Sequence, residues 1–368
     1  MEPIPFLSLA PQHVIAHNAI TEALKKGFEK NWYVLGEEVK KFETEYAQFT
    51  KVRHCVGVGN GYDALSISLR ACNVGAGDEV IVPAHTYVAT WLAVSNCGAV
   101  IVPVEPDPAT MLIDVGRIEE NITQKTKVIL PVHLYGHACE MTKIQEIAAR
   151  HSLTIIEDNA QAHGAKWNEK MTGSFGAINA TSFYPTKNLG ALGDGGAVTT
   201  DSDAIADFVR QYRNYGFERK NYCEVAGINS RLDEQQASVL NIKLKYLDQW
   251  NHERRELARQ YIERLRGVGD LQLPITHYQA LPVYHLFVIR SAKRDKLKAY
   301  LDAGQIETMI HYPLPPHLQK PYTSLNLKTR NLQITEEIAH TSLSLPLWPG
   351  MHASQVAYVC DRISAFFS

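Results

Sequence analysis

Short apolar runs rich in β-branched residues alternate with segments of helical periodicity through the first half of the chain. In residues 63–72 and 140–150 the apolar positions recur at spacings of three and four, the period of a helix with one buried face. Such alternation predicts a sheet built from βαβ units, with most strands parallel. The strands are expected at residues 54–59, 79–84, 100–105, 127–133 and 154–158.

The pattern changes after this point. Two further strands are expected at residues 179–184 and 196–200, and a glycine-rich run at 190–196 joins them. A stripe of leucines then predicts one long helical stretch from about residue 232 to 265, which leaves the sheet and crosses to the remainder of the chain.

The C-terminal part predicts a smaller α/β unit. We place the boundary near residue 250, which gives a large domain of residues 1–250 and a small domain of residues 251–368. The predicted fold class is therefore α/β, with a mostly parallel sheet flanked by helices and a smaller C-terminal α/β domain. In the small domain, strands are expected at 283–290 and 306–312, a helix at 294–303, and further helices near Thr335 and Ser354.

Composition places the chain among soluble proteins that act on small molecules. Of its 368 residues, 45% are hydrophobic and 21% are charged, and the formal net charge is -2. This balance offers no electrostatic case for a nucleic-acid or membrane partner, and no apolar run approaches the length of a membrane span. The first ten residues do not have the pattern of a secretory signal. Six cysteines without a CxxC pair suit a reducing compartment, so we expect a cytoplasmic protein.

A glycine-rich turn, Gly57-Val-Gly-Asn-Gly61, joins the first predicted strand to a helix. Free backbone N–H groups at the start of that helix could hold a phosphate. The glycine spacing differs from the dinucleotide fingerprint, and no P-loop lysine follows. Taken alone, the run also fits a simple tight turn.

Two polar segments follow expected strands. The strand at 154–158 ends in Glu157 and Asp158, at the edge where open α/β sheets bind ligands. Asp158 could stabilise a cationic ring nitrogen through a charge-assisted hydrogen bond, whereas Glu157 is interpreted as a cap of the next turn. Lys187 follows the strand at 179–184 among apolar and small residues, where loss of solvent would lower its pKa and favour a Schiff base.

The phosphate turn, Asp158 and Lys187 occur in the order used by fold-type I enzymes that depend on pyridoxal 5'-phosphate (PLP). More narrowly, the chain resembles the DegT-type (DegT/DnrJ/EryC/StrS) PLP-dependent sugar-nucleotide aminotransferases over nearly its whole length. The resemblance implies the fold of aspartate aminotransferase. The matching motifs are Trp32-Tyr-Val-Leu-Gly36, Pro83-Ala-His-Thr-Tyr87, Glu157-Asp-Asn-Ala-Gln161, Ser182-Phe-Tyr-Pro-Thr-Lys187, Gly227-Ile-Asn-Ser-Arg231 and His311-Tyr-Pro313.

The resemblance also implies PLP as cofactor and a role for each matching residue. Lys187 would be the Schiff-base lysine and the acid/base that moves the proton between substrate and cofactor. Asp158 would pair with the ring nitrogen and keep it protonated. The remaining implied contacts are Gln161 at the ring oxygen O3', Tyr87 stacked on the ring, and, around the phosphate, the backbone of Gly61 and Tyr62, the Ser182 hydroxyl and Asn229 of a neighbouring subunit. The last contact implies a homodimer with shared active sites.

The implied substrates are a nucleotide-linked keto sugar and glutamate. The arginine clamp that transaminases of α-amino acids keep for the substrate carboxylate is not evident. The segments around Asp158 and Lys187 are most similar to family members that act at C3 of the sugar. We therefore expect amino transfer to C3 of a dTDP-3-keto-6-deoxyhexose, giving a dTDP-3-amino-3,6-dideoxyhexose for polysaccharide or glycan biosynthesis. The expected sugar contacts are Tyr184, His311, Tyr312 and His163, and His317 is either a further contact or an ordinary loop residue.

Other interpretations remain open at this point. The acceptor could be a C4 ketone or a UDP-linked keto sugar, and a PLP-dependent sugar dehydratase shares the scaffold. In the best-known dehydratases a histidine replaces the lysine that is present here as Lys187. A nicotinamide-dependent dehydrogenase is suggested only by the glycine-rich turn, and a non-catalytic sugar-binding protein is disfavoured by the intact Lys187 and Asp158. His133 and His137 are four residues apart, but Gly136 interrupts a helix there and no metal site is expected.

Overall fold

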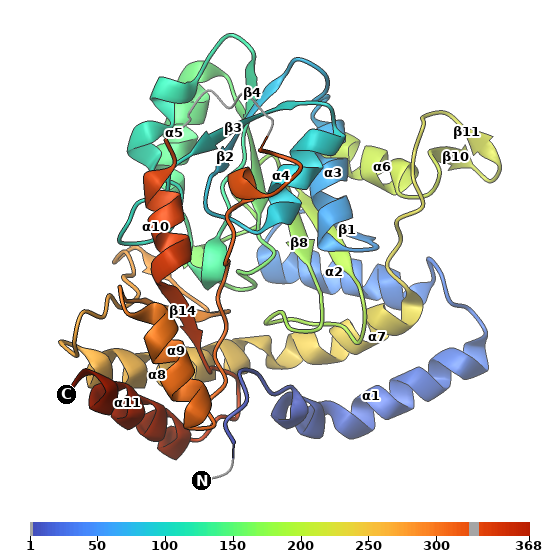
Figure 1. The fold of residues 1–368 in the computed structure, drawn as a ribbon. Coiled ribbons are helices and arrows are strands. Elements are labelled where there is room, and N and C mark those ends of the chain that lie inside the picture. The colour runs from blue at the N-terminus through green and yellow to red at the C-terminus, as the bar shows by residue number, and fades with distance from the viewer. Residues whose placement is uncertain (1–2, 324–330) are drawn as a thin grey trace.

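A seven-stranded sheet forms the centre of the larger part of the molecule (Figure 1). The computed structural model describes residues 3–323 and 331–368. The strands of the sheet are β1 His54–Val58, β2 Glu79–Pro83, β3 Val100–Val104, β4 Thr126–Ile129, β5 Thr154–Asp158, β8 Ile178–Ser182 and β9 Gly196–Thr200. They lie side by side in the order β1-β9-β8-β5-β4-β2-β3, and within this sheet β9 is the strand that runs antiparallel to its neighbours.

The mostly parallel sheet confirms the predicted fold class. Each strand expected between residues 54 and 200 is present, although β4 is shorter than expected. Pro131 explains the early end of β4, because proline has no N–H to donate to a neighbouring strand. Val132 still forms an isolated bridge with Asp158, so the chain continues beside β5.

Helices pack against the sheet. α3 (Gly61–Ala71) lies against β8 and β9, and α4 (Val88–Asn96) lies against β2 and β3. α5 (Met141–His151) packs on β5, and α6 (Asp203–Tyr212) packs on β1 and β9. The helices predicted at 63–72 and 140–150 correspond to α3 and α5.

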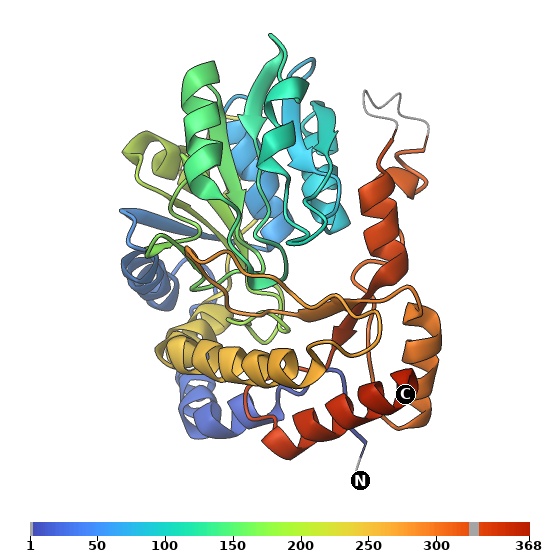
Figure 2. The same cartoon turned by 90° about the vertical axis from the view of Figure 1, so that its left-hand side faces the viewer.

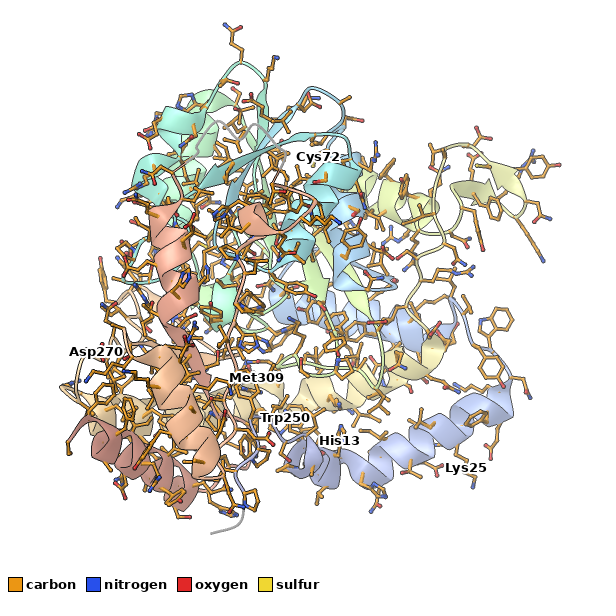
Figure 3. The ribbon with its side chains drawn as sticks, in the orientation of Figure 1. His13, Lys25, Cys72, Trp250, Asp270 and Met309 are labelled. Atoms are coloured by element: carbon orange, nitrogen blue, oxygen red, sulfur yellow. The ribbon has the colours of Figure 1, made fainter. Side chains whose placement is uncertain are left out.

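Two N-terminal helices, α1 (Ala10–Lys30) and α2 (Glu37–Thr50), were not predicted from the hydrophobic pattern. Both pack against α7 (Glu234–Lys243). The buried residues of α1 are Gln12, Ala16 and Ile20, and this stripe is too narrow and too polar to stand out in the sequence. Figure 3 shows the labelled His13 and Lys25 on this helix, at the lower edge of the molecule.

The long helical stretch predicted at 232–265 is present at residues 234–265, but it is divided into two helices. A short 3-10 turn, Leu244–Tyr246, separates α7 from α8 (Leu247–Leu265). α7 is enclosed between α1 and α2, whereas α8 packs its buried stripe against α11 (Ala353–Phe367). The two halves therefore have different partners, and the tighter turn changes the phase of the helix between them.

The C-terminal part has its own apolar core, formed by residues of α8, α9, α11, β13 and β14. α9 is Arg294–Ala303, and β13 (Phe287–Arg290) pairs antiparallel with β14 (Ser342–Leu345). Figure 2 shows α8, α9 and α11 below the large sheet. Ile4, near the N-terminus, is buried in this second core, and the domain boundary near residue 250 stays a prediction.

The expected C-terminal strands are shorter than predicted. Residues 283–286 precede β13 as irregular chain, and residues 306–312 form isolated bridges at Ile306 and Met309 in place of a strand. The remaining elements are β6 Lys166–Trp167, β7 Lys170–Met171, β10 Phe217–Arg219, β11 Tyr222–Cys223, β12 Ala280–Leu281, α10 Gln333–Thr341 and the 3-10 turns Val115–Arg117, Glu119–Asn121, Leu134–Gly136 and Pro316–Leu318. Among the described residues, no helix is both long and apolar enough to cross a membrane.

Candidate active site

A cavity of about 490 Å³ lies at the carboxyl ends of β5 and β8, beside residues of the C-terminal part. This is the edge at which open α/β sheets bind ligands. Ten of the twelve residues predicted from the sequence line it. They are Gly61, Tyr62, Tyr87, Asp158, Gln161, Ser182, Tyr184, Lys187, His311 and Tyr312.

The glycine-rich turn brings the start of α3 against the end of β8. Asn60 caps α3, and its Oδ1 accepts a hydrogen bond from the backbone N–H of Asp63 at 2.8 Å. A Cβ at Gly61 would lie 2.5 Å from the Cβ of Ser182, so this close approach requires glycine. The free N–H groups of the first helical turn and the Ser182 hydroxyl therefore lie together, as an anion site needs. The hydroxyl of Tyr62 accepts a hydrogen bond from the amide of Asn96 and is thus already engaged.

Asp158 is the last residue of β5 and is buried. Its Oδ2 accepts a hydrogen bond from Thr90 Oγ1 at 2.9 Å, and its Oδ1 accepts one from the backbone N–H of Ala160 at 3.1 Å. Burial raises the pKa of Asp158, while these hydrogen bonds and the charge of Lys187 lower it. A buried carboxylate held in this way is suited to a cationic partner in the cavity.

Lys187 lies on the loop that follows β8. Its backbone N–H donates to the carbonyl of Tyr184 at 2.8 Å, and within the described residues its Nζ has no hydrogen-bond partner. Burial lowers the pKa of Lys187 to about 8, and the nearby Asp158 carboxylate opposes that shift. Helix α7 holds this loop in place, because the buried Nζ of Lys243 donates to the carbonyl of Gly190 at 2.8 Å.

Gln161 connects the large sheet to the C-terminal segment. Its Oε1 accepts a hydrogen bond from the backbone N–H of Tyr135 at 2.7 Å, and its Nε2 donates to the hydroxyl of Tyr312 at 3.0 Å. The Tyr135 hydroxyl donates to the carbonyl of His311 and lies 2.7 Å from Nε2 of His85. These contacts fix the side of the cavity that His311 and Tyr312 form.

Aromatic side chains line the outer part of the cavity. The rings of Tyr87 and Tyr312 lie 5.3 Å apart, and Tyr184 is 53% exposed. The Nδ1 of His311 lies 2.8 Å from the Ser344 hydroxyl, and burial together with the Lys187 charge lowers the pKa of His311 to about 4. His311 is therefore neutral at physiological pH and can exchange hydrogen bonds with a hydroxylated ligand.

The structure does not bring two of the predicted residues into the cavity. His163 is buried behind β8, where its Nε2 donates to the carbonyl of Ser182 at 2.9 Å. Asn229 is exposed and lies outside the cavity of its own subunit. His317 also lies outside, and its Nε2 is 3.1 Å from Glu336.

Three residues of the site were missed by sequence reasoning: Thr90, Tyr135 and His285. Thr90 contacts Asp158 from α4, Tyr135 supports Gln161, and His285 lines the cavity from the chain before β13. None lies in a motif that points to its role. The His285-Leu-Phe stretch reads as the start of an apolar strand, and only the fold brings it to Lys187.

Glu157 has a structural role, although it caps the turn at residues 173–176 and not the turn that directly follows it, which corrects that prediction. Its carboxylate is fully buried and accepts hydrogen bonds from the backbone N–H groups of Gly173, Phe175 and Gly176. Nε2 of His133 lies 2.7 Å from the same carboxylate. Among the described residues there is no cluster of three or more His, Cys, Asp or Glu side chains that could hold a metal ion.

The groups around the cavity fit PLP. The start of α3 and Ser182 offer neutral donors for a phosphate, and Asp158 offers a buried carboxylate for a cationic ring nitrogen. Lys187 offers an amine that is partly deprotonated near neutral pH, as imine formation requires. Tyr87 lines the same cavity and supplies a flat aromatic side chain that suits stacking on the ring of the cofactor.

The chain is similar over nearly its whole length to known aminotransferases, and the matching crystal structure of NtdA from Bacillus subtilis has the cofactor PMP bound, at 31% identity and a TM-score of 0.92, covering 100% of this chain and 86% of that one. The model of the DegT/DnrJ/EryC1/StrS aminotransferase family matches residues 15–364. The dTDP-3-amino-3,6-dideoxy-alpha-D-galactopyranose transaminase of Aneurinibacillus thermoaerophilus is 45% identical, over 99% of this chain and 99% of its own length. The dTDP-3-amino-3,4,6-trideoxy-alpha-D-glucose transaminase of Streptomyces venezuelae is 44% identical, over 98% of this chain and 95% of its own. The crystal structure of S. venezuelae DesV in complex with a ketimine intermediate matches with a TM-score of 0.98 and 43% identity, covering 100% of this chain and 99% of that one.

Proposed function

This chain belongs to the DegT/DnrJ/EryC1/StrS aminotransferase family, and we propose that it transfers an amino group from glutamate to C3 of a dTDP-3-keto-6-deoxyhexose. The product would be a dTDP-3-amino-3,6-dideoxyhexose for glycan biosynthesis. One observation carries the proposal: two relatives that match at 45% and 44% identity over nearly the full length have names that describe dTDP-3-amino sugar transaminases.

The protein is a PLP-dependent sugar aminotransferase. When bound, PLP supplies an electron sink that stabilises negative charge on the carbon next to the transferred nitrogen. The protein supplies binding, orientation and proton transfer. In the proposal, the first turn of α3 at Gly61 and Tyr62 and the hydroxyl of Ser182 hold the phosphate, and Tyr87 covers one face of the ring.

Asp158 and Lys187 would carry the charge and the proton. Asp158 would accept a hydrogen bond from the protonated ring nitrogen, whose positive charge would favour the ionised carboxylate against the effect of burial. Lys187, with a pKa of about 8, would take a proton from the substrate carbon as the neutral amine and return it as the ammonium. Gln161, fixed by the N–H of Tyr135, would help to orient the cofactor ring.

The outer cavity suits a sugar. Among the described residues that line it none is an arginine, the usual partner of a substrate carboxylate in transaminases of α-amino acids. Tyr184, His311 and Tyr312 offer hydroxyl and imidazole groups that match sugar hydroxyls. His163 would act only indirectly, through the backbone of Ser182.

We also propose a cytoplasmic homodimer with shared active sites. Asn229 is exposed and outside its own cavity, so it could contact a phosphate only in a neighbouring subunit. Its neighbour Ser230 is buried and bonds Gly59 and Asp63 of its own chain, which fixes the segment that carries Asn229.

The reaction can be tested by incubating the purified protein and PLP with glutamate and each of three acceptors: a dTDP-3-keto sugar, a dTDP-4-keto sugar and a UDP-linked 3-keto sugar. We expect amination of the first at C3, identified by NMR of the product. Preferred amination at C4, or of the UDP-linked sugar, would redirect the assignment within the family. Loss of a hydroxyl group without amination would indicate a dehydratase.

A Lys187→Ala variant tests the assignment of the lysine. We expect it to lose both the visible absorption band that PLP gives when bonded to the protein and all transamination. Lys187→Arg is the matched control for charge, and it should lose both as well, since a guanidinium does not form an imine. Transamination that survives either change would reject the assignment.

A further inference from the structure

His285 lies in the cavity with Lys187 but has no part in the chemistry described so far. It is 9% exposed and comes from the irregular chain before β13. Its imidazole ring has one hydrogen-bond partner among the described residues, the side chain of Asn188, the residue that follows Lys187. The environment of Asn188 determines which nitrogen of His285 carries a proton.

The orientations of two buried amides follow from the carbonyl oxygens next to them. Asn251 Nδ2 lies 2.8 Å from the backbone oxygen of His163, so the NH₂ end of this amide faces that oxygen. Its Oδ1 then accepts from Asn188 Nδ2 at 2.9 Å, and the same nitrogen of Asn188 donates to the carbonyl of Val283 at 3.0 Å. Asn188 therefore turns its Oδ1 toward His285.

This leaves one tautomer for a neutral His285. Its Nδ1 lies 3.2 Å from Asn188 Oδ1, an atom that carries no proton, so Nδ1 bears the hydrogen and donates it. Nε2 then has a free lone pair and can act only as an acceptor. Among the described residues Nε2 has no partner, although His285 and Lys187 line the same cavity.

The charges around His285 keep it neutral. Burial lowers its pKa well below the usual value for histidine, and the positive charge of Lys187, followed by that of Arg254, lowers it further. No proton is therefore held on Nε2 near neutral pH. The imidazole offers a lone pair to a group that, in its ammonium form, has three N–H donors.

We propose that His285 is a positioning residue for Lys187: when the lysine is free of the cofactor and protonated, its amino group turns toward His285, and Nε2 accepts a hydrogen bond from it. The inference rests on the proposed role of Lys187. Such a bond is stronger to the ammonium than to the neutral amine, so it holds the proton-carrying form within the cavity. The Asn188 and Asn251 amides ensure that Nε2 never competes as a donor.

Two conservative substitutions separate the two nitrogens of the ring. The side-chain amide of asparagine lies near the position of histidine Nδ1, and that of glutamine reaches the position of Nε2. His285→Asn therefore keeps a donor to Asn188 and loses the acceptor in the cavity. His285→Gln keeps the acceptor and loses the contact with Asn188.

The readout is the rate at which cofactor-free protein forms the visible absorption band with PLP, measured over a series of pH values. Only the neutral amine of Lys187 attacks the aldehyde, so the pH midpoint of this rate reports the pKa of Lys187. The other titratable groups that interact with Lys187 are Asp158, His163 and His311, and Asp194 lines the same cavity. All four are unchanged in both variants.

Loss of an acceptor for the ammonium lowers the pKa of Lys187. We expect the midpoint of His285→Asn to lie about one pH unit below wild type, a roughly tenfold change in the ratio of the two protonation states. His285→Gln should keep the wild-type midpoint. In full transamination we expect kcat of His285→Asn to fall about tenfold with KM unchanged, because the lost bond acts on the lysine and not on substrate binding.

A second buried histidine serves as a matched control. His137 packs against the ring of Tyr284 and lies outside the cavity, so His137→Asn should keep the wild-type midpoint. The proposal would be overturned if the pH midpoint of His285→Asn equals that of wild type, or if the midpoints of the Asn and Gln variants shift equally. His285 would then serve only to hold the side chain of Asn188. Thermal unfolding of each variant checks the fold.

Failure of the inference can be told from failure of the proposed function. A wild-type protein that gives no visible band with PLP, or a Lys187→Ala variant that gives one, would remove the premise. If His285→Asn does not fold, NMR of isotope-labelled histidine nitrogens in the wild type decides the question, with the His285→Gln variant identifying the signal. A proton on Nδ1 alone supports the proposal, and a proton on Nε2 contradicts it.

Discussion

Burial shifts the pKa values of the two charged residues at the centre of the cavity in opposite directions. It lowers the pKa of Lys187 to about 8 and raises the pKa of Asp158, while each charge partly restores the other. A lysine with a pKa near neutrality can both accept and donate a proton, which an exposed lysine does not do at this pH. This reactivity costs folding stability, because the ammonium is held away from water.

The first prediction concerns that cost. Lys187→Met should raise the free energy of unfolding of the cofactor-free protein by about 3 kcal/mol at pH 7, since the pKa of Lys187 is lowered from 10.5 to about 8. Below pH 8 the lysine is charged in both the folded and the unfolded states, and the penalty is complete. As pH rises from 8 to 10.5 the folded state loses its proton first, so the gain should shrink. Urea denaturation of both proteins at several pH values measures this gain in the free energy of unfolding. A gain that grows with pH would contradict the prediction.

The second prediction concerns Asp158. Asp158→Asn keeps the shape and a hydrogen-bond acceptor for Thr90 but removes the charge that we propose holds a proton on the cofactor ring. We expect the visible band to form as in wild type, since Lys187 is intact, and kcat to fall by roughly a hundredfold.

Thr90→Val provides the graded comparison. It removes one hydrogen bond to Asp158 and leaves the carboxylate in place, so kcat should fall by about threefold to tenfold. A wild-type kcat in Asp158→Asn, measured with saturating PLP, would show that the charge at this position is not needed.

At the scale of single residues, the sequence predicted those parts of the site that motifs carry. Asp158 ends an apolar strand and Lys187 follows another, so both could be placed at the edge of a parallel sheet. His285 could not, because its role depends on a tautomer set by Asn188, Asn251 and a backbone carbonyl far away in the sequence. Hydrogen-bond networks of this kind have no local signature.

At the scale of elements, the close contact between α3 and β8 forms the proposed phosphate site. A Cβ at position 61 would meet Ser182 at 2.5 Å, so Gly61→Ala should push the start of α3 away from the end of β8. We predict that the affinity for PLP falls by at least about tenfold, the scale of one displaced charge-assisted hydrogen bond. Titration of cofactor-free protein with PLP, followed by absorbance, measures this change.

Gly75 offers the matched control for this substitution. A Cβ at Gly75 would meet nothing within 4 Å, so Gly75→Ala should bind PLP as the wild type does. Equal affinities in the Gly61 and Gly75 variants would show that α3 can move without loss of the phosphate contact.

Elements were predictable where burial imposes a clear period. Strand β3 is a continuous apolar run, β2 is one after its first residue, and α5 has one well-defined apolar face. The exposed α1 does not, and its place against α7 is a tertiary effect. The break between α7 and α8 was missed for a related reason, because helical periodicity continues through the 3-10 turn while the packing partners change.

At the scale of the whole molecule, the cavity depends on two cores. The cavity walls that carry Asp158 and Lys187 belong to the large sheet. His311 belongs to a segment packed against the second core, and the His311 ring forms a hydrogen bond with Ser344 of β14. The sequence could not predict how the segment with His311 packs beside β14, since residues 306–312 do not form the strand that was expected. The proposed sugar contacts therefore depend on how the C-terminal part packs against the sheet.

The proposed sharing of Asn229 between subunits makes a prediction for mixed dimers. Lys187→Ala subunits lack the lysine but keep Asn229, and Asn229→Ala subunits keep the lysine. If Asn229 acts in the neighbouring subunit, one of the two sites in a mixed dimer combines the intact Lys187 of one chain with the intact Asn229 of the other. Co-refolding the two inactive or impaired variants should then recover up to about a quarter of wild-type kcat per subunit, since half of a random mixture is mixed and half of its sites are complete.

The same experiment separates the alternatives. If Asn229 served its own subunit, every mixed dimer would contain only sites that lack either the lysine or the asparagine, and activity would not exceed the average of the two parents. A monomeric protein, detected by light scattering at the assay concentration, would likewise give no recovery. Because Asn229 is exposed and lies outside the cavity of its own chain, recovery above the parental average is the expected result.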